Sequence, residues 1–147
     1  MKRILRSAIV EHSAADMYAL VERIEAYPEF LPWCRGARVR ERAPGRTVAT
    51  LAVGLGGVRY EFTTENANRP PQAIELRLLE GPFRHFAAHW RFGALGERAA
   101  RIEFAMEYLF AGAVVSRALG PVFEAIADTM VDAFKRRADA VYGQAAD

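Results

Sequence analysis

The sequence contains a single cysteine, Cys34, among its 147 residues. One thiol cannot form a disulfide within the chain or a zinc cluster built from cysteines, so we expect neither of these, and no redox function. Long apolar runs are lacking as well. The longest weakly charged stretch, 109–123, contains Arg117 and two glycines. It is shorter than the roughly 20 apolar residues that a membrane-spanning helix needs, and we expect no such helix.

Several common functional signals are also missing. The chain begins Met-Lys-Arg and continues into the strand-like residues 4–10, without the apolar segment and cleavage site of a secretory leader. The nucleotide and zinc motifs GxxxxGKS/T, GxGxxG and HExxH do not occur. The formal net charge of +2 is small for a domain that binds nucleic acid through charge. We expect a protein that starts near Met1, stays in the cytoplasm and holds no metal.

Length and composition predict one folded domain spanning 1–147. Hydrophobic residues make up 52% of the chain and charged residues 26%, which is ordinary for a globular domain with a sizeable core. No stretch rich in Ser, Gly or Pro marks a boundary between two domains. The whole chain is therefore expected to fold around one core.

The expected elements follow the order strand, helix, short helix, six strands and long helix. Residues 3–11 are rich in β-branched side chains and predict a first strand. Ser13, with Asp16 three residues later, predicts the start of a helix. The two prolines within 27–34 limit any helix there to a single turn. From Val39 onward, short β-like runs alternate with turn signals that contain Gly or Pro.

Alternation in the later strands separates an apolar face from a charged one. In the segment 86–92, for example, Phe86 and Trp90 alternate with His89 and Arg91. The last helix carries a long apolar stripe at helical spacing. Pro121 fits the first position of that helix, or a kink in a helix that begins earlier.

These elements predict an α+β protein with the helix-grip fold. A curved antiparallel sheet of about seven strands, in the order β-α-α-β6-α, wraps around the long C-terminal helix. If the sheet curls around the helix, its aromatic inner face encloses an apolar cavity that holds a small ligand. The same pattern is that of a filled core, and periodicity alone does not decide between a cavity and packed rings.

Three strings carry a family resemblance. Tyr27-Pro28-Glu29-Phe30-Leu31-Pro32-Trp33-Cys34, together with Glu80-Gly81-Pro82-Phe83 and the following Trp90-Arg91-Phe92, resembles the coenzyme Q-binding, RatA-like family of START-like (SRPBCC, polyketide cyclase/dehydrase-like) proteins. The first string is specific, because its Pro, aromatic and Cys positions together are improbable by chance. The resemblance runs over nearly the whole chain, from about residue 6 to residue 142.

The resemblance implies a helix-grip fold with a hydrophobic tunnel, and three alternative functions. The first is binding of ubiquinone or a related polyprenyl quinone, as a carrier or chaperone that supports respiration. The second is that of a ribosome-associated toxin that binds the large ribosomal subunit and blocks subunit association. The third is a polyketide cyclase or aromatase-like enzyme. The resemblance carries over no catalytic set and no covalent or metal cofactor.

The residues expected to contact a ligand come from the motif strings, the inner strand faces and the stripe of the last helix. They are Tyr27, Phe30, Leu31, Trp33, Tyr60, Phe62, Leu76, Leu78, Phe83, Phe86, Trp90, Phe104, Met106, Phe123, Ile126, Met130 and Phe134. The inner-face hydroxyls of Tyr60, Thr64 and Tyr108 are candidates to hydrogen-bond a quinone carbonyl, or else they bond backbone or water.

Polar groups suited to catalysis are few. We expect His12, His85 and His89 to be solvated at turns or on the outer face, and Cys34 has no neighbouring His or Lys that would activate its thiol. The chain is therefore expected not to be an enzyme. A His or Arg pointing into the cavity would support the cyclase alternative.

Two surface segments are candidates for larger partners. In the basic stretch 35–46, Arg38, Arg40 and Arg42 are expected on one strand face, either for contact with anionic lipid headgroups or ribosomal RNA, or as a merely solvated face. The apolar stretch 109–123 is a candidate to gate the cavity or to dip transiently into a membrane surface, at the periphery of the inner membrane. Simple packing is its alternative. The sequence predicts no oligomeric state.

Overall fold

The computed structural model of the protein describes residues 1–143. Its elements, in chain order, are β1 (Lys2–Val10), α1 (Ala14–Glu22), the 3-10 helix η1 (Ile24–Glu29), β2 (Cys34–Ala43), β3 (Arg46–Val53), β4 (Tyr60–Arg69), β5 (Ala73–Glu80), β6 (Phe83–Gly96), β7 (Ala99–Phe110) and α2 (Ala113–Tyr142). The expected order of one strand, two short helices, six strands and a long helix is confirmed.

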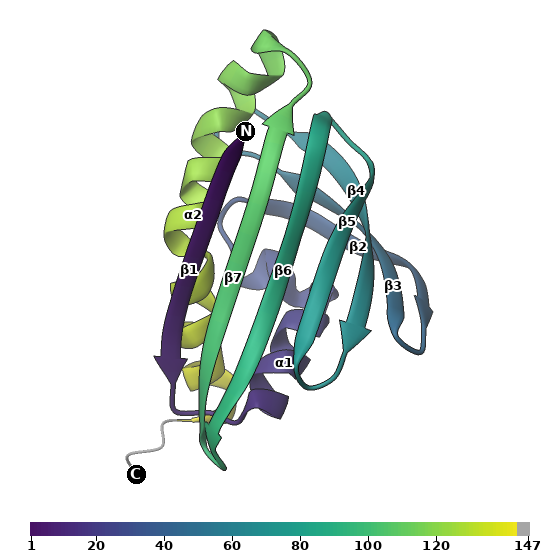
Figure 1. Ribbon diagram of the computed structural model, residues 1–147. Coiled ribbons are helices and arrows are strands. Elements are labelled where there is room, and N and C mark those ends of the chain that lie inside the picture. Colours follow the sequence, from purple (N-terminus) through teal and green to yellow (C-terminus); the bar gives the residue numbers. More distant parts are fainter. Residues whose placement is uncertain (144–147) are drawn as a thin grey trace.

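The seven strands form one antiparallel sheet in the order β1-β7-β6-β5-β4-β3-β2. The sheet curves, and α1, η1 and α2 all lie on the same side of it (Figure 1). This is the helix-grip arrangement that the element order predicted. None of the described helices is both long enough and apolar enough to cross a membrane.

The start of α1 follows the predicted cap. The hydroxyl oxygen of Ser13 accepts a hydrogen bond from the backbone N–H of Asp16 at 3.1 Å, which satisfies one of the free N–H groups of the first turn. The buried face of α1, which includes Met17 and Leu20, then packs toward the sheet. Ser13 therefore fixes where the helix begins, and the apolar spacing fixes how it is turned.

The short helix η1 begins at Ile24, three residues before the segment 27–34 with its two prolines, and ends before Pro32 as expected. Pro28 lies inside η1, and the chain leaves the helix at Phe30. The phenol of Tyr27 donates a hydrogen bond to the carbonyl oxygen of Val21. This buried bond ties η1 back to α1, so the two helices hold one position relative to the sheet.

The long helix α2 begins at Ala113 and runs through Pro121. Of the two alternatives that the sequence left open, the earlier start is the one observed, and the placement of Pro121 at the first helical position is wrong. A proline has no N–H to donate to the carbonyl four residues before it, here that of Arg117. Both residues are exposed, so water can bond that carbonyl and the helix continues.

The core lies between the inner face of the sheet and α2. Phe134 of α2 is fully buried, and its ring lies 5.1 Å from the ring of Trp90 on β6, 5.1 Å from Phe30 and 5.5 Å from Tyr27, measured between centroids. All three contacts are edge-to-face, the arrangement that aromatic pairs favour. One side chain thus joins α2, η1 and the sheet.

Replacing Phe134 with alanine should lower the free energy of unfolding by about 3–5 kcal/mol, because the change removes a buried ring and leaves a cavity among three others. Urea denaturation followed by circular dichroism measures this loss. The matched control is Val114→Ala on the same helix, since Val114 is exposed and its change should alter the stability by less than about 0.5 kcal/mol. Equal effects of the two substitutions would contradict the packing described.

Candidate functional site

Every residue expected to contact a ligand belongs to the apolar cluster between the sheet and the helices. The sequence therefore placed all of them on the correct side. They contact one another, however. Phe62, Phe83 and Phe86 pack together with centroid distances of 5.2–5.5 Å, and Phe123 of α2 lies 5.3 Å from Phe83. Trp90 lies 5.0 Å from Phe104 in the same way.

The expected wide apolar cavity is thus filled by the side chains that were expected to line it. A hollow of about 20 Å³ remains beside Trp90, Tyr27, Ile74 and Leu76, which is room for about one water molecule. Strand alternation gives the face on which a ring lies but not the distance to the opposite helix. For this reason the sequence could not distinguish an open tunnel from packed rings.

A polar entrance lies next to this small hollow, between α1 and the ends of β3 and β4. The entrance hollow measures about 360 Å³ and shares Glu22, Thr47 and Asn68 with the inner one. Thr47 and Asn66, which point inward from β3 and β4, are 1% and 4% exposed. Hydroxyl, amide and carboxylate groups therefore meet at an opening whose inner wall is apolar.

The hydrogen bonds of this entrance are incomplete. The amide of Asn68 donates to the hydroxyl oxygen of Thr47 at 2.9 Å, and the hydroxyl of Thr64 donates to the amide oxygen of Asn66 at 2.7 Å. The phenol oxygen of Tyr18 on α1 is buried, and the Glu22 carboxylate lies near it without meeting normal hydrogen-bond geometry. Burial, the negative charge of Glu22 and the weak hydrogen bond to its carboxylate together raise the pKa of Tyr18 to about 12. This phenol therefore stays protonated and can donate to a bound oxygen atom.

Sequence reasoning named Thr64 but missed the rest of the entrance. Thr64 uses its hydroxyl within the protein, which is the alternative given for it. The alternation that placed Phe62 and Thr64 inward also places Asn66 and Asn68 on the same face of β4, and this signal was available. Tyr18 gave no such signal, because only the tertiary packing of α1 brings it to the strands.

The basic stretch does not form one face, contrary to expectation. The pairing of β2 with β3 shifts between Val39 and Glu41, so Arg40 is an extra residue, and Arg38 and Arg42 pair with positions on opposite faces of β3. Arg42 donates to both carboxylate oxygens of Glu25, at 2.9 and 3.2 Å. These hydrogen bonds lower the pKa of that carboxyl. The three arginines therefore cannot act as one patch.

The histidines and the cysteine also differ in their surroundings. His12 is 6% exposed, and its Nε2 lies 2.7 Å from Oδ1 of Asp139 near the end of α2, so the expectation of a solvated side chain is wrong. His85 and His89 are partly exposed, and His85 bonds Glu107 on β7. Cys34 is buried, and burial raises the pKa of its thiol, as befits an apolar and unreactive side chain.

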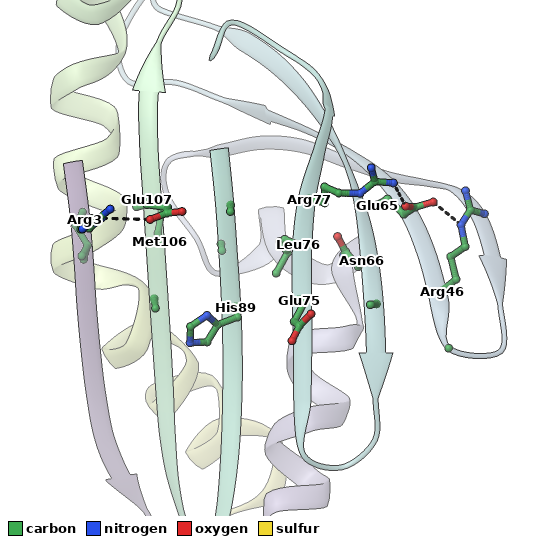
Figure 2. A pocket seen from close by; sticks show the side chains of 16 residues that line it. Arg3, Arg46, Glu65, Asn66, Glu75, Leu76, Arg77, His89, Met106 and Glu107 are labelled. Atoms are coloured by element: carbon green, nitrogen blue, oxygen red, sulfur yellow. Dashed lines mark hydrogen bonds and ion pairs between the residues drawn. The ribbon is translucent and has the colours of Figure 1, made fainter. Parts of the chain in front are cut away.

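A third hollow, of about 760 Å³, lies on the outer face of the sheet (Figure 2). Its lining includes four runs of three consecutive strand residues, 65–67, 75–77, 87–89 and 105–107. In each of these runs two outward residues flank an inward one. Ala67, Ala87 and Ala105 form a shallow floor. The surrounding charges neutralise each other, since Arg3 pairs with Glu107 and both Arg46 and Arg77 pair with Glu65. This groove offers no excess charge of either sign.

Comparisons with known proteins give the family context of these features. Residues 10–135 match the family described as polyketide cyclase/dehydrase and lipid transport. The chain is 40% identical to the ribosome association toxin RatA of Escherichia coli over 97% of this chain and 90% of that protein. It is 28% identical to the mitochondrial coenzyme Q-binding protein COQ10 homolog B of Xenopus laevis, over 94% of this chain and 58% of that protein.

Among solved structures, the Zhui aromatase/cyclase of Streptomyces sp. R1128 superposes with a TM-score of 0.82 at 18% identity, over 94% of this chain and 93% of that one. At this identity the similarity concerns the fold alone. The two curated relatives described above, among others that match, are named as a toxin and a binding protein and not as enzymes, in agreement with the expectation from the sequence.

Two tyrosines of the site allow a direct test of the weakly bonded phenol of Tyr18. Tyr18→Phe should leave the free energy of unfolding unchanged or raise it by about 1 kcal/mol, because it removes a buried hydroxyl that has no well-formed hydrogen bond. Tyr27→Phe is the matched control: its hydroxyl bonds the Val21 carbonyl, so its loss should destabilise the protein by about 1–3 kcal/mol. Urea denaturation compares the two, and an equal loss in both variants would contradict the geometry described.

Proposed function

The chain belongs to the polyketide cyclase/dehydrase and lipid transport family, and we propose that within it this protein associates with the ribosome, as a protein of the RatA kind. The observation that carries the proposal is the similarity to RatA of Escherichia coli, which is 40% identical over 97% of this chain. Because aromatic rings fill the interior, we expect the contact with the ribosome to lie on the surface of the protein. Association with ribosomes would place the protein in the cytoplasm.

A cluster of arginines on the outer face of the sheet fits an anionic partner. Arg69, Arg91 and Arg101, which we call the arginine cluster, are exposed and form no ion pair with any residue from 1 to 143. Arg69 on β4 and Arg91 on β6 both pair with Ala73 on β5, which puts their side chains on one face of the sheet. Arg101 on β7 pairs with Gly93, two residues after Arg91, and therefore lies on the same face. Glu103 is the acidic residue directly opposite Arg91.

The arginine cluster replaces the basic stretch on β2 as the proposed contact with ribosomal RNA. Free guanidinium groups can bind phosphates and release counterions, and this release is the main source of charge-driven affinity for nucleic acid. Guanidinium groups already paired with carboxylates, such as Arg42 with Glu25, gain less from the same contact. We propose the large ribosomal subunit as the partner, and the experiment below separates it from the small one.

A second function is favoured by the polar entrance. We propose that it binds the ring of a quinone such as ubiquinone, with the phenol of Tyr18 and the amide of Asn66 donating to ring carbonyl oxygens. Trp90, Ile74 and Leu76 line the small hollow next to the entrance, so they can serve as an apolar wall for the ring only if that hollow of about 20 Å³ widens. A polyprenyl tail would then have to lie along a path that the aromatic rings now fill, so binding of the tail requires that they separate.

The ribosome proposal predicts co-migration with the large subunit on sucrose gradients at low salt. The variant Arg69→Gln/Arg91→Gln/Arg101→Gln should bind about tenfold or more weakly, and its binding should depend less on salt, because three phosphate contacts are lost. The matched control removes the same charge from paired arginines, as Arg42→Gln/Arg46→Gln/Arg77→Gln. If the wild-type protein stays at the top of the gradient and migrates with neither ribosomal subunit, the proposed function is wrong. Equal losses in both triple variants would refute the arginine cluster as its contact.

The quinone proposal predicts saturable binding of a short-tailed ubiquinone in equilibrium dialysis. Tyr18→Phe and Asn66→Leu should each weaken binding by roughly five- to tenfold, since each removes one donor to the ring. Thr50→Val is the control, because the Thr50 hydroxyl is buried on the opposite face of the sheet, where it bonds Thr63. Absence of binding by the wild-type protein, or the same loss in the control, would rule this ligand out.

A further inference from the structure

The start of α2 forms an exposed apolar projection. The helix begins beyond the ends of β1 and β7 (Figure 1). Val114 in its first turn is 78% exposed, and Leu109 at the end of β7 is 42% exposed. Residues 111–113, all Ala or Gly, are exposed between them. Aliphatic side chains so exposed in neighbouring segments mark a contact surface when they lie together.

Basic side chains surround this projection. Lys2 and Arg84 line a hollow of about 600 Å³ together with Leu109 and Ala113. Arg117 lies three residues after Val114 and is therefore on the same side of α2. Lys2, Arg84 and Arg117 form no ion pair with any residue between 1 and 143. We call residues 109–117, with Lys2 and Arg84, the α2 tip.

The charge of the α2 tip is positive. It has three basic side chains, and the hollow that Lys2 and Arg84 line contains one acidic side chain, that of Glu124, so the positive charges are in excess. Glu107, two residues before Leu109, is engaged by Arg3 and His85. Arg117 is the single charge between Tyr108 and Phe123. An apolar centre with a cationic border complements an anionic surface that also has an apolar interior.

We propose that the α2 tip docks on an anionic lipid bilayer, with Leu109 and Val114 inserted among the lipids and Lys2, Arg84 and Arg117 at the headgroup phosphates. A lipid partner is favoured over RNA because the exposed side chains are aliphatic, whereas unpaired RNA bases stack on aromatic rings. The nearby aromatic ring, Phe110, is already stacked on Phe83 in the core at 5.5 Å. This surface is independent of the arginine cluster and of the polar entrance.

Vesicle flotation of the full chain tests the proposal. The protein should float with vesicles of phosphatidylcholine mixed with phosphatidylglycerol, and much less with phosphatidylcholine alone. Val114→Glu should reduce the bound fraction by about tenfold, since it places a charge at the inserted position. Arg84→Gln and Arg117→Gln should each weaken binding by about fivefold at low salt.

The controls use the opposite end of the molecule. Leu95 and Arg98 lie at the exposed β6–β7 hairpin, so Leu95→Glu and Arg98→Gln change the same types of residue and should float like the wild type. Circular dichroism confirms that each variant is folded. Failure of the wild-type protein to float, or an equal loss in the hairpin variants, would overturn the proposal. So would α2 tip variants that lose binding to ribosomal RNA while they keep binding to vesicles.

Discussion

Two aromatic rings on α2 determine where most of the other elements can lie. Phe123 contacts rings on β4, β6 and β7, and Phe134 contacts rings on β6 and at η1. Because buried rings pack as densely as a crystal, none of these segments can shift alone. The contact with η1 also positions α1, since Tyr27 bonds back to Val21. Phe134 therefore helps to determine the shape of the polar entrance, although its ring does not line it.

Sequence patterns predicted the parts of the fold that depend on local spacing. Alternation in the later strands assigned Phe86, Trp90 and Phe104 to the inner face, and the Ser13 cap marked the start of α1. Both signals are properties of neighbouring residues, so no knowledge of distant segments was needed. The same reasoning reaches the inward amides of β4. It does not reach Tyr18, whose burial depends on how α1 packs against the strands.

The errors arose where one residue or one distant contact changes the outcome. The extra residue Arg40 reverses the face of the sheet on which each later side chain of β2 lies. A strict alternation between two faces assumes that no residue is extra, so it could not predict this reversal. His12 is buried because Asp139, far along the chain, meets it. The cavity is the clearest case. The identity of the inner residues was predicted correctly, but the spacing between sheet and helix depends on how rings such as Phe123 interlock.

The proposed functions differ in whether the filled interior of the protein has to open. η1 is held on α2 by Phe134 and also by Arg137, which bonds Glu29 at 2.8 Å and lies 4.9 Å from the centre of the Phe30 ring. A long lipid tail can enter only if these contacts open, and a ligand shifts that equilibrium only by the amount that it prefers the open state. Contacts at the arginine cluster and at the α2 tip need no opening. These two surfaces lie at opposite ends of the sheet, so a ribosome bound at one would leave the other free to reach a membrane.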